Sequence, residues 1–261
     1  MKLGCTLGGE HFKFAGEIER LKANGINVFQ VFTGSPEQYH HIPPTAGTKK
    51  ALENCEYLIH SPYWFSFFKK ESFPKMVKYL QFLLRNWTLP DRELLFVTHT
   101  SSFKSDLSMQ NNYIAYERVC KFLMRALPAI DERLKIVIEN DAGHQSSITP
   151  KVDVLVKVKE LFEGKVGICI DTEHAFSDGE DILNLPYDKA DVIHLNAIPP
   201  YVAHGGHLDR HSYTSLKSSK LDMKPIISKI KEQISDDVPV ILERYDKDLV
   251  LDDIEYIKSV G

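Results

Sequence analysis

Eight short apolar runs, most of them separated by helical patterns, constrain the fold of this chain more than any other feature of its sequence. Such alternation predicts parallel strands joined by right-handed crossovers. Eight units in 261 residues fit a closed α/β structure, the (β/α)8 TIM barrel, better than an open sheet. We therefore expect residues 1–261 to form a single domain. The expected strands are Leu3–Leu7, Ile26–Phe32, Tyr57–Ile59, Leu94–Val97, Leu134–Ile138, Val166–Ile170, Asp191–Ile193 and Val238–Leu242.

Helical periodicity fills the intervals between these runs. In Pro74–Trp87, for example, Met76, Leu80 and Leu83 recur on one face. A long segment, Asn196–Ser219, has no clear period and is expected to be a loop. The expected helices are His11–Asn24, Thr48–Asn54, Pro74–Trp87, Gln110–Ala126, Lys151–Phe162, a short one near Asp181–Leu185, Lys224–Ile234 and Leu249–Val260.

Composition narrows the class of protein. No apolar run approaches the ~20 residues that cross a bilayer, and the opening MKLGCTLGG does not resemble a signal peptide. The four cysteines form no CxxC pair, which favours free thiols in a reducing compartment, so we expect an intracellular protein of the cytoplasm or nucleus. We also expect a monomer. The net charge of −4 argues against broad nucleic-acid binding but permits a locally cationic cleft. Neither a GxGxxG after the first strand nor a P-loop is present.

Metal-ligand side chains stand where the expected strands end. From the third strand to the eighth they are His60, His99, Glu139, Asp171, His194 and Glu243, with His174 three residues after Asp171. The carboxyl ends of barrel strands converge on one mouth. The long loop adds Asp209 and His211 in a D-x-H spacing. Alone, each of these residues could be a satisfied polar residue or an ion-pair partner, but their recurrence at six successive strand ends predicts a metal site.

The type of ligand limits the metals. Five histidines and four carboxylates, with no cysteine, suit zinc or manganese, and nine ligands exceed what one ion takes. We expect two or three ions. Clustered metals suit phosphoester hydrolysis, because one can activate water while others hold the attacking and leaving oxygens.

The motifs resemble those of the endonuclease IV family, zinc-dependent apurinic/apyrimidinic endonucleases built on a xylose isomerase-like TIM barrel. The similarity spans nearly the whole chain, and all nine positions that match the family's metal ligands carry a ligand residue. The matching segments are Phe29–Tyr39, Ile59–Tyr63, the His99 strand, Ile138–Asn140 with Ala142–Gly143, the CIDTEHAFSDGED run, His194–Asn196, Asp209–His211 and the ILE of the last strand.

The resemblance implies about three Zn²⁺ ions per chain, with Mn²⁺ as an alternative at one site. His60 and His99 would bind one ion, with Glu139 bridging to a second. Asp171, His194 and Glu243 would complete the second site. His174, Asp209 and His211 would hold the third. We take the carboxylates Glu139, Asp171 and Glu243 as catalytic.

The resemblance also implies a reaction. The substrate would be duplex DNA with an abasic site, cut on the 5′ side of the lesion to leave a 3′-hydroxyl. The abasic nucleotide would be flipped out of the duplex, which a missing base makes easier. Tyr63, which matches the family, and Arg210 are the expected DNA contacts. The aromatic run Tyr63–Phe68 could stack on bases or pack on the barrel rim.

Departures from the family pattern lie away from the metal ligands. Thr6 replaces a usual histidine, Glu37 and Tyr39 stand where a basic residue and a tryptophan are common, and Ala197 replaces an aspartate. The Gly-x-Gly that normally follows D-R-H is missing from HSYTSLKSS.

Two other functions remain open. A single-metal sugar isomerase or epimerase could use Glu139, Asp171, His194 and Glu243 alone, which leaves the other five ligands without a role. A non-catalytic protein that binds damaged DNA could keep the metals without cleaving.

Overall fold

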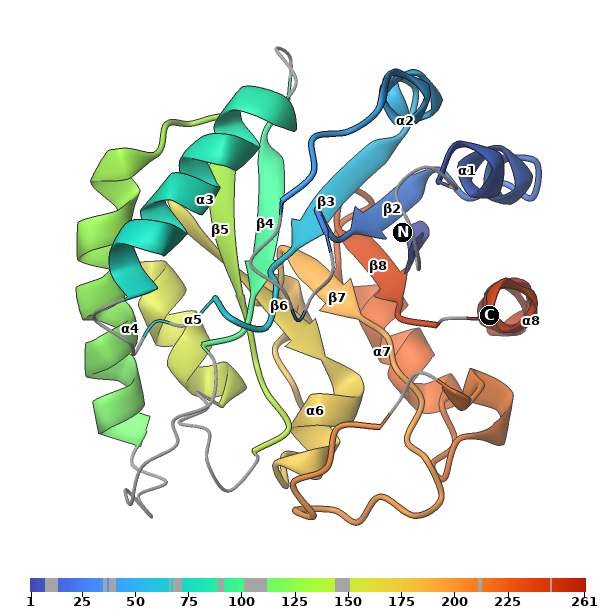
Figure 1. Ribbon diagram of the computed structural model, residues 1–261. Helices are drawn as coiled ribbons and strands as arrows, with labels where there is room; N and C mark the ends of the chain where they lie inside the picture. Colours follow the sequence, from blue (N-terminus) through green and yellow to red (C-terminus); the bar gives the residue numbers. More distant parts are fainter. Residues whose placement is uncertain are drawn as a thin grey trace.

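The computed structural model shows eight parallel strands closed into a barrel, in which each strand pairs with the next in the chain and β8 pairs with β1 (Figure 1). This confirms the predicted (β/α)8 fold. The structure describes residues 1–7, 14–34, 37, 41–65, 67, 72–88, 92–100, 112–143, 151–210, 213–244 and 246–261. The strands are β1 (Lys2–Thr6), β2 (Val28–Val31), β3 (Glu56–His60), β4 (Leu94–Thr98), β5 (Leu134–Glu139), β6 (Val166–Asp171), β7 (Val192–His194) and β8 (Pro239–Leu242).

Helices surround the barrel, as Figure 1 shows. In the part of the chain that the structure describes, seven of the expected helices are present, and their bounds differ from the expected ones by a few residues. They are α1 (Phe14–Lys22), α2 (Ala46–Leu52), α3 (Phe73–Asn86), α4 (Asn112–Ala126), α5 (Val152–Leu161), α7 (Lys224–Gln233) and α8 (Lys247–Ser259).

One expected helix was misplaced. Residues 181–185 form turns, and the short helix of this connection is instead α6 (Thr172–Ser177), directly after β6. The reason is a local cap: the side chain of Asp171 accepts a hydrogen bond from the backbone N–H of His174, 2.8 Å away, which starts the helix at the strand end. As a result, His174 lies on a helical turn against the barrel mouth rather than in a loop.

The two faces of each strand pack against different partners. In β6, Val166, Ile168 and Ile170 belong to the large core between strands and helices, whereas Cys169 belongs to a second cluster. That second cluster fills the barrel interior with one residue from each of seven strands: Val28, Leu58, Val97, Val137, Cys169, Val192 and Ile241. Because side chains alternate along a strand, the residue two positions beyond each of these also faces the barrel axis, one layer nearer the mouth.

Two expectations about composition can be compared with the structure. All four cysteines are buried and free of disulfides. In the described part of the chain, no helix combines the length and the apolarity needed to cross a bilayer.

Candidate metal centre

A ring of polar side chains occupies the layer above the apolar plug of the barrel. All but Thr6 lie two residues after a residue of the second cluster, as His60 follows Leu58 and Glu139 follows Val137. The alternation that buries the plug therefore also directs these groups to the mouth. The ring consists of Thr6, Gln30, His60, His99, Glu139, Asp171, His194 and Glu243, and it includes all six of the predicted strand-end ligands.

Glu139 lies among four imidazoles. Its Oε2 is 3.2 Å from His60 Nε2 and 3.3 Å from His99 Nε2. Its Oε1 is 2.7 Å from His194 Nδ1 and 3.4 Å from His174 Nδ1. The two oxygens of this fully buried carboxylate thus face two different groups of histidines.

Two further carboxylates, those of Asp171 and Glu243, lie beside His194. His194 Nδ1 is 3.4 Å from Glu243 Oε2 and 3.8 Å from Asp171 Oδ2. On the outer side, His174 Nε2 is 3.6 Å from Asp209 Oδ2. Eight of the nine predicted ligands therefore converge at one mouth, and the ninth, His211, lies outside the described residues.

Hydrogen bonds at the far side of three histidine rings set their orientation. His60 Nδ1 is 2.9 Å from the carbonyl oxygen of Ser61, and His174 Nδ1 is 3.1 Å from that of Asn140. Because a carbonyl only accepts, each ring donates from Nδ1, which leaves Nε2 of His60 facing Glu139 and Nε2 of His174 facing Asp209. His194 uses the opposite arrangement, with Nε2 against Gln30 Oε1 at 2.8 Å. Metal-binding histidines are typically oriented in this way.

Three residues that the sequence reasoning did not assign hold the carboxylates in place. Asn196 donates to Asp171 Oδ2 at 2.6 Å and to Glu243 Oε2 at 3.0 Å, and Gln30 donates to Glu243 Oε1 at 2.7 Å. Asn140 forms a reciprocal pair with the backbone of Asp171. The sequence does contain a signal for Gln30, because it follows the interior residue Val28 by two positions.

The electrostatics reflect this crowding. Burial alone would raise the pKa of Glu139, but the neighbouring charges of His194 and His99 hold it well below its usual value. Burial alone would lower the pKa of His174, but Asp171 and Asp209 raise it well above its usual value. Burial alone would also lower the pKa of His194, but Cys169, Glu139 and Glu243 raise it well above its usual value.

The donor set fits metal ions. Among the described residues, the donor atoms of His60, His99 and Glu139 lie within 4.8 Å of one another, and so do those of Glu139, Asp171, His194 and Glu243. Glu139 belongs to both groups. Imidazole nitrogens and carboxylate oxygens are the usual donors to Zn²⁺ and also suit Mn²⁺.

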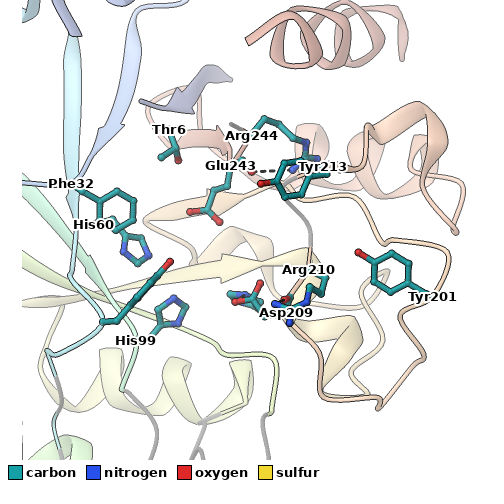
Figure 2. A pocket seen from close by; sticks show the side chains of 12 residues that line it. Thr6, Phe32, His60, His99, Tyr201, Asp209, Arg210, Tyr213, Glu243 and Arg244 are labelled. Atoms are coloured by element: carbon teal, nitrogen blue, oxygen red, sulfur yellow. Dashed lines mark hydrogen bonds and ion pairs between the residues drawn. The ribbon is translucent and has the colours of Figure 1, made fainter. Parts of the chain in front are cut away.

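A cavity of about 270 Å³ opens above these groups. Figure 2 shows His60, His99 and Phe32 on one side of it, with Arg210, Tyr201 and Tyr213 on the other. Tyr63 also lines the cavity and is 59% exposed. The two predicted DNA contacts, Tyr63 and Arg210, therefore lie at the mouth.

The rest of the aromatic run packs inward where it is described. Phe65 and Phe67 are buried, and the ring of Phe67 stacks on Phe122 with centroids 3.9 Å apart. Of the two alternatives for this run, packing on the rim holds for these residues. Among the departures from the family pattern, Ala197 is buried in the core, and Glu37 is exposed.

Comparison with known proteins agrees with this geometry. The profile of the family described as xylose isomerase-like TIM barrel matches residues 92–260. The chain belongs to this family. Within the family it is a divergent relative of the endonuclease 4 proteins. It is 25% identical over 243 residues to the "Probable endonuclease 4" of Methanosphaerula palustris, covering 80% of this chain and 82% of that one.

Two solved structures share the fold. Endonuclease IV from Thermus thermophilus superposes with a TM-score of 0.70 at 17% identity, covering 99% of this chain and 98% of that one. The IOLI protein, crystallised with a zinc atom bound, gives a TM-score of 0.69 at 13% identity over 100% and 96% of the two chains. At these identities the structures establish the fold alone.

Proposed function

We propose that this protein is a metal-dependent endonuclease that hydrolyses the phosphodiester on the 5′ side of an abasic site in duplex DNA and leaves a 3′-hydroxyl. The observation that carries the proposal is the position of Glu139, whose two oxygens face His60 and His99 on one side and His194 on the other. A carboxylate so placed can bridge two ions, which a single-metal enzyme does not need. The endonuclease 4 relatives support DNA as the substrate.

The contacts among the described residues support the proposed ligand sets. His60, His99 and Glu139 would hold one ion, and Glu139, Asp171, His194 and Glu243 a second. His174 and Asp209, which face each other, would hold a third together with His211. We propose Zn²⁺ at these sites, with Mn²⁺ as the alternative at one of them. When bound, such ions lower the pKa of water and offset charge on a phosphate.

The residues of the chain itself would orient the substrate. Asn196 and Gln30 fix the directions of Asp171 and Glu243, so the carboxylates cannot rotate away as substrate enters. Arg210 and Tyr63 at the rim would contact the DNA backbone and the bases beside the lesion. The cavity would receive the flipped sugar, and we propose that a single domain acts as a monomer.

The test is a nicking assay on a duplex that contains one tetrahydrofuran abasic analogue, with end-group analysis of the product. Glu139→Gln and His99→Ala should lower the rate by at least about 100-fold, the loss typical when metal ligation is disturbed. Glu160→Gln, on the exposed face of α5, is the matched control and should cleave like the wild type. Full activity of Glu139→Gln, or a product without a 3′-hydroxyl, would contradict the proposal.

A second candidate is a sugar isomerase or epimerase. Glu139, Asp171, His194 and Glu243 alone form a four-ligand group among the described residues, which would serve one ion. Metal analysis separates the two functions, because one ion per chain favours the isomerase and two or three favour the nuclease. A non-catalytic damage-binding protein would bind the abasic duplex without nicking it.

A further inference from the structure

Among the proposed ligands that the structure describes, Asp209 is the least enclosed. Its side chain is 46% exposed, whereas those of Glu139 and Asp171 are fully buried and that of Glu243 is 14% exposed. Asp209 also lies on a long connection, since residues 195–210 form neither helix nor strand. Something other than regular structure must therefore hold its carboxylate near His174.

Ser177 bonds the backbone beside Asp209. This fully buried residue ends α6, and its hydroxyl both accepts from the N–H of Leu208 and donates to the carbonyl of Leu208, each at 2.7 Å. Leu208 immediately precedes Asp209. A single hydroxyl thus fixes both backbone groups of the residue next to the ligand.

Further bonds align the same stretch along α6. The N–H of His207 donates to the carbonyl of Ser177 at 3.0 Å, and that of Gly205 donates to the carbonyl of Phe176 at 3.2 Å. The ring of His204 packs edge-on against Phe176. Figure 1 shows the connection after β7 running beside α6. The connection is therefore attached to the helix that carries His174.

We propose that Ser177 is a positioning residue for an outer metal site formed by Asp209 and His174. It sets the backbone before Asp209 and, through α6, ties it to the turn that bears His174. This inference rests on the proposed metal centre and adds a residue that is neither a ligand nor in contact with substrate.

The chain contains a matched control. Ser219 makes the same kind of two-way contact with the same connection, because its hydroxyl accepts from Ile198 N–H at 2.9 Å and lies 3.4 Å from the Ile198 carbonyl. Ile198 is far along the chain from Asp209. Ser219→Ala therefore removes a comparable pair of contacts from the same connection without touching the ligand's neighbour.

The first measurement is amide hydrogen exchange in the metal-free protein. Ser177→Ala should speed exchange at Leu208 by about tenfold or more, the effect of one lost hydrogen bond. Ser219→Ala should leave Leu208 unchanged. Unchanged protection of Leu208 in Ser177→Ala would overturn the proposal.

The second measurement is a Co²⁺ titration of the metal-free protein, followed by its visible absorption. In the wild type, one equivalent should depend on Asp209 and vanish in Asp209→Asn. Ser177→Ala and the near-isosteric Ser177→Cys should weaken that equivalent by about tenfold or more and leave the others unchanged. In Asp209→Asn the added Ser177→Ala should have no further effect.

Wild-type titration curves for both Ser177 variants would refute the role of Ser177, and so would the absence of any Asp209-dependent equivalent in the wild type. These results are independent of the nicking assay. A protein that nicks abasic DNA but shows no effect of Ser177 keeps the proposed function and loses this inference. A protein that shows the Ser177 effect but does not nick keeps the inference and loses the function.

Discussion

Removal of Arg244 should destabilise the protein strongly and in a pH-dependent way. The guanidinium is fully buried, and its Nε donates to Asp253 Oδ2 at 3.2 Å, while Nη1 donates to Asn196 Oδ1 at 2.8 Å. Asp253 is also buried and accepts from the N–H of Leu216 at 2.7 Å. Arg244→Met would therefore leave a buried carboxylate without its counter-charge, a change that costs about 3–5 kcal/mol.

The pH dependence follows from the carboxyl group of Asp253. Burial already raises its pKa, and Arg244 opposes that rise. Without Arg244 the folded-state pKa of Asp253 rises further above the unfolded value. The penalty is then full at a pH above the folded pKa and shrinks as the pH falls toward the unfolded pKa, because the protonated acid needs no counter-charge. Urea unfolding should give a larger loss at pH 8 than at pH 5.

A double mutant isolates the charge. Asp253→Asn keeps an acceptor for Leu216 N–H and removes the carboxylate, so Arg244→Met with Asp253→Asn should recover about 2 kcal/mol relative to Arg244→Met alone. Equal losses at pH 8 and pH 5, or a double mutant no more stable than Arg244→Met, would refute the reasoning.

Three more predictions concern pH, metals and DNA. Burial raises the pKa of Glu180 to about 7 from 4.5, so its contribution to stability is fully present below pH 4.5 and is lost, by roughly 3 kcal/mol, as the pH rises through 7. Urea unfolding of Glu180→Gln should therefore show a flatter dependence of the unfolding free energy on pH. An unchanged dependence would exclude Glu180 as its source. Prolonged treatment with a strong chelator should abolish nicking and Zn²⁺ should restore it, whereas a metal-free preparation of full activity would contradict metal dependence. Tyr63→Ala should weaken binding of the abasic duplex by about 1–3 kcal/mol in a fluorescence titration with a neighbouring 2-aminopurine, if its exposed ring stacks on a base. Tyr201, a second exposed tyrosine that lines the cavity, provides the comparison as Tyr201→Ala, and identical curves for Tyr63→Ala and the wild type would exclude stacking.

The strands and the convergence of the predicted ligands could be derived from sequence because both depend on local alternation. In a run such as Val166–Asp171, side chains that face the surrounding helices alternate with side chains that face the barrel axis. The residue at the carboxyl end of the run can therefore be assigned to the barrel mouth. His60, Glu139 and His194 are the last residues of their strands, as expected. The fold prediction holds for the same reason, while the roles of the ligands remain a proposal.

The residues that sequence reasoning missed act through contacts between distant segments. Asn196 donates a hydrogen bond to Glu243, and Arg244 donates one to Asp253. No periodicity in the sequence indicates either pair. The misplaced helix at 181–185 has another origin, since the side-chain cap of Asp171 outweighed the weak helical pattern further along. Asp171 can serve both as a candidate ligand and as the cap that starts α6.

The two faces of each strand separate the residues that stabilise the fold from those that form the polar ring. Outward side chains such as Ile168 and Ile170 anchor the helices, and the inward plug closes the lower end, so the polar ring contributes little to the packing of the scaffold. Substitutions within the ring would therefore alter its chemistry while the scaffold persists. In the same way, any ion or ligand of the ring would reach it from the mouth, because the plug residues below the ring fill the barrel axis.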